Sequence, residues 1–371
     1  MFKRPFVPVN TKGVNNLAKK FTPVSRNLKF TLLTYNILSP SYMWPKVYTY
    51  VPEKYKDWNF RHKLLEHEIM HLYKADIMCF QEMTHKDYNE FWAPMALQKL
   101  QMKSKFISKT APKYWTSSDE QLDGCSIFYN QNMFEFISSK GIYLNQLLSA
   151  FNEQELLYLS TRELQLTDGG GNPMGTTSLL QFLRDRNQVC LFVTLRHKPS
   201  DLIFVIINTH LYWKYDDVKL SQCLVIMREL NSIVNGLLKA AKEDLDVTSD
   251  KVRILFTGDL NSTKKETVIN FLRGQIINTM DLNLVNPMRT YLNHCVYDDI
   301  PRECFEYTCY SGKLKGIFDY IWYHDTHFEL SKILNGKEVS KELKFKNQFG
   351  LPNDDHPSDH IPLLAEFKIL L

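Results

Sequence analysis

The sequence predicts an α/β protein in which packed sheets are covered by outer helices. Short apolar runs rich in β-branched residues alternate with amphipathic stretches from one end of the chain to the other. The 371 residues are 44% hydrophobic and 13% aromatic, which is enough to bury a large core. No internal repeat and no Pro/Ser-rich linker divides the sequence. We therefore expect one large domain with helices outside the sheets.

Strands are predicted where a short apolar run stops at turn-forming residues. The first two, 30–38 and 75–82, flank an amphipathic stretch at 60–74, in which Leu65, Ile69 and Leu72 share one helical face. The further runs are, in order, 124–130, 188–196, 202–211, 252–261, 316–323 and 361–369. A long helix is predicted from about residue 218 to 242, because its apolar residues recur at helical spacing.

Two regions lack a clear period. Within residues 145–187, the Gly-rich segment TDGGGNPMG is predicted to be a flexible surface loop, because it lacks the GK[ST] ending of a phosphate-binding loop and no clear strand precedes it. Residues 335–355 are polar and irregular, and they are predicted to be an insertion ahead of the last strand.

Charge and cysteine content narrow the class of protein only slightly. A net charge of +4 is close to balanced, so it neither proves nor excludes a nucleic-acid partner. The seven cysteines form no CxxC pair, which favours reduced and mostly buried thiols over a disulfide framework or a zinc site. No apolar run approaches the length that spans a bilayer, so no transmembrane segment is predicted.

Residues 1–28 are predicted to be a basic N-terminal arm or a targeting segment, ahead of a domain at 29–371. Through Phe30 the chain carries seven basic residues and no acidic one, a composition that suits a mitochondrial presequence. Pro5, Pro8 and Pro23 interrupt a continuous amphipathic helix, however, so a plain basic arm is equally compatible. The expected location is cytoplasmic or mitochondrial.

The predicted strands share one feature, which is a polar group at or near one end. The residues concerned are Asn36, Glu82, Asn208, His210, Asp259, Asn261, Asp319, Asp359 and His360. Any one of them could be a turn residue or a core histidine. If the strands lie side by side, however, their ends form one crevice, which is where ligands bind in open α/β sheets.

The chemistry of this set favours hydrolysis of a phosphate ester. Oxygen ligands without thiolates suit Mg²⁺, with Mn²⁺ as the alternative, better than zinc. The histidines lack the HExxH spacing of zinc proteases, and no GxSxG elbow supports a serine nucleophile. A cation that offsets phosphoryl charge, a carboxylate that activates water and a histidine that stabilises developing charge would together suffice.

The chain resembles the exonuclease–endonuclease–phosphatase superfamily from about Lys29 to Leu371. Within it, the chain is similar to the branch of nocturnin, Angel and the catabolite-repression deadenylases, and closest to the yeast nocturnin-like RNA exonucleases. The motifs are, in order, TYNILSPSY, WNFRHKLLEHEI, ADIMCFQEM, LDGCSIFYN, INTHLYW, FTGDLNS, KGIFDYIWY and SDHIPLL. The resemblance implies a four-layer α/β/β/α sandwich with two central mixed sheets.

The resemblance also implies roles for individual residues. It assigns metal binding to Glu82, Asn36 and Asp359, catalysis to His210, Asp259, Asn261, Asp319 and His360, and substrate binding to Asn208, Tyr215 and Lys315. Asp259 and Asn261 would position and activate the attacking water. His360 would contact the scissile phosphate, with Asp319 orienting it.

The implied function is that of a Mg²⁺-dependent, deadenylase-like 3′→5′ exoribonuclease that acts on the 3′ end of single-stranded RNA in mRNA decay. Catabolite-repression deadenylases hold an adenine between a proline and a phenylalanine, at offsets that fall here on Tyr215 and Leu314, so strict poly(A) preference is not implied. Lys313 and Lys315 flank the expected site and could contact phosphates.

Two classes of alternative stay open on the sequence alone. One is another phosphoesterase of the superfamily, such as a DNA endonuclease or a 2′,5′-phosphodiesterase. The other is a non-catalytic RNA-binding scaffold that kept the fold.

Overall fold

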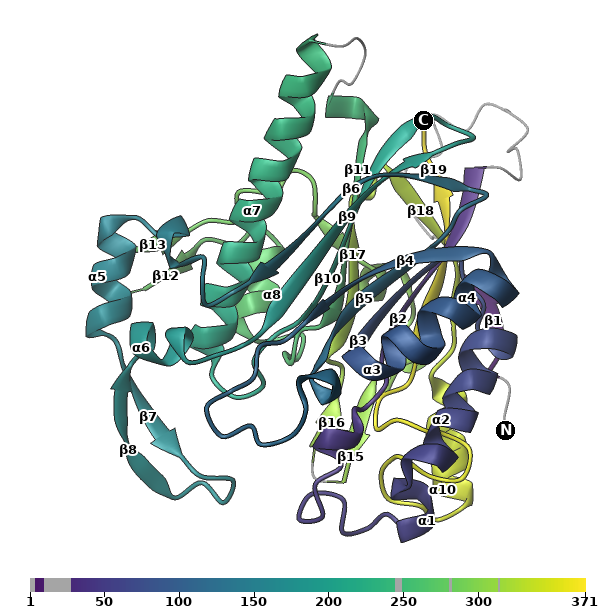
Figure 1. Cartoon of the computed structure of the whole chain (residues 1–371). Helices are drawn as coiled ribbons and strands as arrows, with labels where there is room; N and C mark the ends of the chain where they lie inside the picture. The colour runs from purple at the N-terminus through teal and green to yellow at the C-terminus, as the bar shows by residue number, and fades with distance from the viewer. Residues whose placement is uncertain (1–3, 10–27, 244–248, 280–281, 313) are drawn as a thin grey trace.

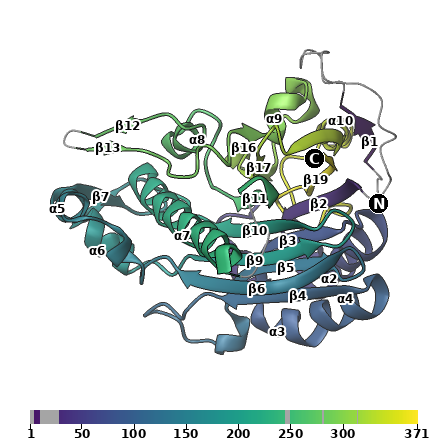
Figure 2. The same ribbon diagram turned by 90° about the horizontal axis from the view of Figure 1, so that it is seen from above.

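Two mixed β-sheets stack face to face and are covered on both outer sides by helices in the computed structural model (Figure 1), which describes residues 4–9, 28–243, 249–279, 282–312 and 314–371. Seen from above, the helices lie on opposite sides of the two stacked sheets, which gives four layers (Figure 2). The predicted fold class is therefore confirmed.

The first sheet, called sheet I, has seven strands. In spatial order they are β1 (Phe6–Pro8), β18 (Phe328–Leu334), β19 (Leu363–Ile369), β2 (Lys29–Asn36), β3 (Ile77–Thr84), β5 (Asp123–Asn130) and β4 (Met102–Ser108). The helices α1 (Glu53–Lys56), α2 (Trp58–His67), α3 (His85–Asp87) and α4 (Ala93–Leu100) follow β2 and β3 in the chain. Leu65 and Ile69 pack with Leu33 and Phe80 in one cluster, so α2 and the turn after it cover the outer face of sheet I.

The second sheet, called sheet II, has six strands. In spatial order they are β14 (His294–Cys295), β17 (Asp319–Tyr323), β11 (Val252–Asp259), β10 (Leu202–His210), β9 (Val189–His197) and β6 (Phe134–Tyr143). The long helix α7 (Asp216–Glu243) and the helix α8 (Thr267–Leu272) lie on its outer side (Figure 2). The remaining helices are α5 (Glu153–Thr161), α6 (Leu179–Arg184), α9 (Val296–Asp299) and α10 (Lys337–Phe345).

Aromatic side chains fill the space between the sheets. Phe30 of sheet I meets Phe204 of sheet II edge to face, with ring centroids 5.4 Å apart. Phe204 in turn meets Phe328 of sheet I at 5.6 Å. Such pairs each add about 0.5–1.5 kcal/mol beyond the area that they bury. The two sheets are thereby held in one fixed relation.

Each sheet contains one parallel strand pair in its centre. In sheet I β2 runs parallel to β3, and in sheet II β10 runs parallel to β11. Strand β17 is antiparallel to β11, and it begins with Asp319 directly opposite the last residue of β11, Asp259. The strand ends that carry the predicted polar groups therefore lie at the same edge within each sheet.

All eight strands and both helices predicted from the sequence are present, with end shifts of a few residues. The region 145–187, which shows no clear period in the sequence, forms α5, the hairpin β7 (Glu163–Thr167) and β8 (Pro173–Ser178), and α6. The Gly-rich run is the turn of that hairpin, where Asp168 Oδ1 accepts from the backbone N–H groups of Gly170 (2.8 Å) and Asn172 (2.9 Å).

Other elements were missed because their apolar pattern is weak. The edge strand β6 exposes most of its side chains, and α10 lies in the region 335–355 that was expected to be irregular. The short strand pairs β12 (Ile277–Asn278) with β13 (Asn283–Leu284), and β15 (Cys309–Ser311) with β16 (Leu314–Gly316), were also not predicted.

Residues 4–9 belong to the sheet rather than to a separate arm. Strand β1 pairs with β18, and the buried guanidinium of Arg4 donates to the carbonyl oxygens of Pro362 (2.8 Å), Leu334 (2.9 Å) and Asn335 (2.9 Å). Residues 1–3 and 10–27 lie outside the described residues, so a targeting role and the cellular location stay predictions. Among the described residues, no helix combines the length and apolarity that crossing a membrane needs.

Asn208 provides a test of how the sheets are joined. Its fully buried amide donates to the carbonyls of Phe80 (2.8 Å) and Ser126 (2.9 Å), and its oxygen accepts from Gln81 Nε2 (2.6 Å). Asn208→Leu removes three buried hydrogen bonds, so we expect a loss of about 2–5 kcal/mol in the free energy of unfolding, measured by denaturant titration.

The matched control is Asn59→Leu on the exposed surface of α2, which should change the free energy of unfolding by less than about 0.5 kcal/mol. Equal effects of the two substitutions would contradict this account of the sheet contact.

Candidate active site

Strand register places three of the predicted site residues side by side in sheet II. His210 pairs with Asp259 across the parallel β10–β11 ladder, and Asp259 pairs with Asp319 across the antiparallel β11–β17 ladder. Residues directly opposite each other project to the same face of a sheet. His210 Nε2 lies 3.5 Å from Asp259 Oδ2 as a result.

Gly258 lets the two parallel strands approach closely at this point. Its φ is +143°, and a Cβ there would lie 2.0 Å from the carbonyl oxygen of Thr209. Only glycine meets both conditions, which explains why a glycine precedes Asp259 in the GDLN motif.

Asn36 connects the two sheets at the site. Its Nδ2 donates to Glu82 Oε1 of sheet I at 2.9 Å and to Asp259 Oδ2 of sheet II at 3.1 Å. Glu82 adopts a φ of +62° at a bulge in β3, which breaks the regular alternation of side chains there. Its other oxygen accepts from the backbone N–H of Ser39 at 2.9 Å.

The segment before β19 adds the last two predicted residues. His360 Nδ1 lies 2.8 Å from Asp319 Oδ2, and its Nε2 lies 3.5 Å from Asp259 Oδ2. Asp359 accepts a hydrogen bond from the hydroxyl of Tyr48 at 2.9 Å. The imidazoles of His210 and His360 therefore both face the same oxygen of Asp259.

Burial shifts the pKa values of the acidic groups upward. Burial, followed by repulsion from the carboxylates of Asp123 and Asp359, raises the pKa of Glu82 to about 7. Burial also raises the pKa of Asp259 to about 6, with His360 opposing the shift and Asp319 adding to it. The solvation and positive charge that the protein provides in this pocket are therefore too weak to keep both carboxylates as easily ionised as they are in water.

The two histidines are shifted in opposite directions. Burial, together with the positive charges of Lys109 and His360, lowers the pKa of His210 well below its usual value. Burial alone would also lower the pKa of His360, but the carboxylates of Asp319 and Asp259 raise it well above the usual value. At neutral pH, His210 is therefore neutral and His360 carries a proton.

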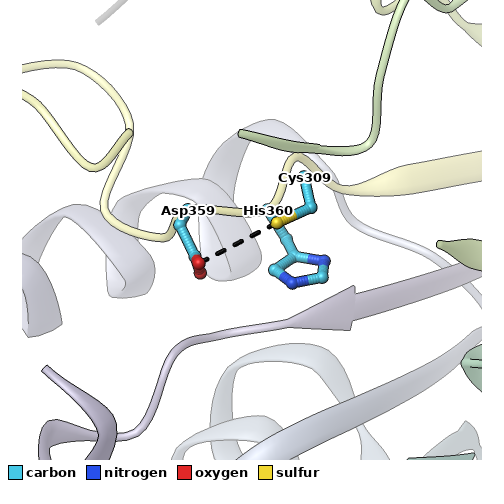
Figure 3. Close-up of side chains that lie close together, drawn as sticks. All are labelled: Cys309, Asp359 and His360. Carbon is cyan, nitrogen blue, oxygen red and sulfur yellow. Dashed lines mark hydrogen bonds between the residues drawn. The ribbon is translucent and has the colours of Figure 1, made fainter. Parts of the chain in front are cut away.

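The donor set fits a divalent cation. The ligand atoms of Asp259, Asp319 and His360 lie within 4.8 Å of one another, and so do those of Cys309, Asp359 and His360 (Figure 3). Buried carboxylates with raised pKa values are the groups that a bound cation would stabilise in their ionised form.

Several supporting residues were missed by sequence reasoning. Lys109 and Asp123 form a buried ion pair at 2.7 Å, and the Tyr42 hydroxyl donates to Asp123 at 2.7 Å. Arg61 Nη1 donates to the carbonyls of Leu38 (2.9 Å) and Pro357 (3.0 Å), which connects the segment after β2 to the segment that precedes Asp359. Arg61 lies in the WNFRHKLL motif, whereas no sequence signal marks Lys109.

Each of the three residues predicted to bind substrate contacts other residues of the protein. Asn208 is fully buried between the sheets, so it supports the pocket from beneath and cannot touch a substrate. One face of the Tyr215 ring packs on Tyr212 at 6.1 Å, and its hydroxyl accepts from Thr167 N at 3.2 Å. Lys315 pairs with Glu306 at 2.5 Å. Asn208 is therefore corrected to a supporting residue, while substrate binding by Tyr215 and Lys315 stays a prediction.

The remaining predicted groups lie as follows. Asn261, with a φ of +47°, donates its amide to the carbonyl of Leu211 at 2.8 Å, and its backbone N–H donates to Asp259 Oδ1 at 2.9 Å. It thus orients Asp259 through the main chain. Leu314 is 48% exposed, and Lys313 lies outside the described residues.

The fold and the pocket together define the class of α/β-sandwich hydrolases that work with a divalent cation. Two stacked sheets bring two imidazoles and several buried carboxylates to one place, beside the thiol of Cys309. The chain belongs to the endonuclease/exonuclease/phosphatase family, whose sequence model matches residues 33–360. The family expected from the motifs is thereby confirmed.

Individual relatives agree with this membership. The chain is 60% identical over 371 residues, and over the full length of both proteins, to the protein named RNA exonuclease NGL1 of Saccharomyces cerevisiae. It is 27% identical to the Ccr4 exoribonuclease subunit of the CCR4-Not complex of the same yeast, a match that covers 99% of this chain and 43% of that protein.

Solved structures share the fold. The structure of ANGEL2, described as a 2′,3′-cyclic phosphatase, superimposes with a TM-score of 0.67 at 21% identity and full coverage of both chains. The human nocturnin catalytic domain has a TM-score of 0.61 at 20% identity, covering 99% of this chain and 97% of that one.

Ser358 allows the coupling between the two halves of the pocket to be tested. Its hydroxyl donates to the carbonyl of Asn36 at 2.7 Å and accepts from the backbone N–H of His360 at 3.1 Å. If the pocket binds a divalent cation, Ser358→Ala should weaken that binding about tenfold, because losing a group that supports metal ligands typically lowers affinity by about 10–100-fold. The measurement is the concentration of Mg²⁺ or Mn²⁺ that gives half of the maximal increase in unfolding temperature.

Ser221→Ala on α7 is the control, since this buried hydroxyl donates only to the carbonyl of Asp217 in its own helix. If the cation concentration that gives half of the maximal increase in unfolding temperature is the same in both variants, Ser358 does not couple the two halves of the pocket.

Proposed function

We propose that this protein is a Mg²⁺-dependent 3′→5′ exoribonuclease that shortens single-stranded RNA. The observation that carries the proposal is the joint placement of Glu82, Asn36 and Asp259 within hydrogen-bond distance in one buried pocket. The 60% identity to a protein named RNA exonuclease, over the full length of both chains, supports RNA as the substrate.

Glu82, Asn36 and Asp359 are the residues proposed to hold Mg²⁺. Glu82 and Asp359 offer carboxylate oxygens, which Mg²⁺ prefers over nitrogen and sulfur, while the Asn36 Oδ1 accepts from the backbone N–H of Leu38 at 3.0 Å. When bound, the ion supplies positive charge that offsets the charge of the phosphoryl oxygens. Glu82 and Asp359 already repel each other, since the latter contributes to the raised pKa of the former. A cation between the two would remove that repulsion.

Asp259 is proposed to accept the proton of the attacking water. Its Oδ1 is held by the backbone N–H of Asn261, so its orientation is set before substrate binds. Its Oδ2 lies 3.5 Å from the Nε2 atoms of both His210 and His360. With a pKa of about 6, Asp259 is mostly ionised at neutral pH but still basic enough to take a proton.

His360 is proposed to donate a hydrogen bond to the scissile phosphate. Its protonated form is stabilised by the carboxylate of Asp319, which holds the ring by Nδ1. The proton on Nε2 is then aimed at the pocket, where negative charge grows during the reaction. His210 stays neutral, so it accepts or donates one hydrogen bond without adding charge.

Base recognition is expected to be broad. Tyr215 packs one ring face on Tyr212, and the second position of the deadenylase adenine site is Leu314, which has no aromatic ring to stack on a base. Trp213 is 57% exposed and follows His210 by three residues, so its indole is an available stacking face. Stacking of a base on an aromatic ring contributes about 1–3 kcal/mol with little sequence preference.

A nuclease assay tests this function directly. RNA oligonucleotides of A-only, U-only and mixed sequence, and matched DNA, carry a 5′ label and are incubated with Mg²⁺. We expect ladders that shorten from the 3′ end of all three RNAs, and EDTA should stop the reaction because the pocket would lose its cation. Glu82→Gln should lower the rate by at least about 100-fold.

Glu90→Gln serves as the matched control, since Glu90 is exposed and pairs only with Lys86 at 4.0 Å. The proposal fails if the wild-type protein leaves every oligonucleotide intact, or if Glu82→Gln and wild type cut equally well.

The effect of Mg²⁺ on stability should depend on pH. Glu82 has a pKa of about 7 in the fold against 4.5 ordinarily, and Asp259 one of about 6 against 3.8. Because the native state then binds these protons more tightly than the unfolded chain, the metal-free protein loses stability as pH rises from about 4 to 7. Mg²⁺ binds the ionised forms, so its stabilising effect should be small at pH 5 and large at pH 8.

Unfolding temperatures with EDTA and with excess Mg²⁺, recorded from pH 5 to 8, measure this effect. We expect the Mg²⁺-dependent rise to reach at least about 2 °C at pH 8. Glu82→Gln should remove most of it. A rise that is the same at every pH would mean that the cation binds elsewhere.

A further inference from the structure

Cys309 places a sulfur atom beside two residues of the candidate active site. Its Sγ lies 3.9 Å from Asp359 Oδ2, and the ligand atoms of Cys309, Asp359 and His360 all lie within 4.8 Å of one another. Figure 3 shows the Asp359 carboxylate turned toward the Cys309 sulfur, with the His360 ring close by. All three side chains are buried.

The backbone holds these residues in fixed positions. An antiparallel bridge joins Cys309 to His360. On either side of it, Tyr310 N donates to the carbonyl of Asp359 at 2.8 Å and Ile361 N donates to the carbonyl of Thr308 at 2.7 Å. The three ligand atoms are thus brought together by the fold itself, with no ion required to collect them.

A thiolate, a carboxylate and an imidazole are a donor set for zinc rather than for magnesium. Zn²⁺ binds cysteine sulfur, histidine nitrogen and carboxylate oxygen in tetrahedral sites, whereas Mg²⁺ selects oxygen. We propose that Cys309, Asp359 and His360 form a second metal site that binds Zn²⁺, and that zinc bound there inhibits the Mg²⁺-dependent reaction. A water molecule completes the fourth position.

The binding step is balanced by the release of two protons. The Cys309 S–H bond breaks as a Zn–S bond forms, a ring N–H bond of the protonated His360 breaks as a Zn–N bond forms, and both protons leave to solvent. Asp359 contributes one carboxylate oxygen, and the Tyr48 hydroxyl donates to its Oδ2, the same oxygen that faces the Cys309 sulfur. His360 contributes a ring nitrogen.

Inhibition follows from the overlap of the two sites. Asp359 is a proposed Mg²⁺ ligand, and His360 is the proposed donor to the scissile phosphate. A zinc ion that holds both removes one ligand from Mg²⁺ and occupies the imidazole. The inhibitory half of the inference rests on the proposed nuclease function, whereas zinc binding itself does not.

The cysteine pattern of the sequence did not indicate such a site. Zinc was set aside because no CxxC pair is present, and Cys309 lies 50 residues from Asp359 in the chain. Within the part of the chain that the structure describes, no other cysteine joins a group of potential metal ligands, although all seven are free thiols. The other cysteines therefore serve as internal controls.

Direct binding is measured first, without reference to activity. The full-length, metal-free protein is titrated with Co²⁺, whose bond to a thiolate gives a charge-transfer absorption band in the near ultraviolet, and Zn²⁺ is then added to displace it. We expect a band that saturates at one equivalent in wild type and in Cys304→Ser, and that is absent in Cys309→Ser. Thermal melting verifies that each variant is folded, and Cys309→Ala replaces the serine variant if that one is not.

The binding half is overturned if wild type gives no thiolate band, or if the Cys309 variant gives the same band. Either result stands whether or not the protein degrades RNA, so this failure is distinct from a failure of the proposed function.

Inhibition is measured second, as RNA shortening in excess Mg²⁺ over a range of Zn²⁺ concentrations. Each variant is compared with its own rate without zinc. The Zn²⁺ concentration that halves the rate should be at least tenfold higher in Cys309→Ser than in wild type and Cys304→Ser. Equal sensitivity of all three would place zinc on the oxygen and nitrogen ligands alone, and would overturn the inhibitory role of Cys309.

Discussion

The amide of Asn36 is the contact on which the candidate active site depends. It donates to a carboxylate from each sheet, Glu82 at 2.9 Å and Asp259 at 3.1 Å. These bonds form only if the end of β2 reaches the end of β11 across the sheet interface. The aromatic packing of Phe30 on Phe204 and the buried amide of Asn208 set that relation. The large core therefore holds the ends of β2 and β11 so close together that the single amide of Asn36 can donate to carboxylates of both sheets.

This arrangement gathers more negative charge than the protein balances. Burial raises the pKa of Glu82 to about 7 and that of Asp259 to about 6, although His360 is protonated nearby. Isolated charges in an apolar interior are costly, and such groups either take up protons or bind a cation. The proposed binding of a divalent ion would thus be a consequence of the fold. The same crowding brings the sulfur of Cys309 to Asp359, so a softer ion can compete for part of the same ligands.

Strand ends were predictable from the sequence because strand periodicity and polar termini are local patterns. Eight strands, both long helices and the positions of Asp259, His210 and Asp319 at their ends followed from such patterns, and the family resemblance supplied the two-sheet architecture. Contacts between segments far apart were not predictable. Arg61, Lys109 and Ser358 act through partners that lie on other elements. The neighbours of Tyr215 and Lys315 were unpredictable for the same reason, since only the folded chain shows that Tyr212 packs on the first and Glu306 pairs with the second.

The central claim, that the buried carboxylates form one cation site across the two sheets, is tested most directly by anomalous diffraction. Crystals grown with Mn²⁺ in place of Mg²⁺ would show the ion as an anomalous peak. The account predicts a peak in contact with Glu82, near Asn36 and Asp359, that is lost in crystals of Glu82→Gln. A peak bound only to surface carboxylates, or a pocket that stays empty while Mn²⁺ supports RNA hydrolysis, would contradict it.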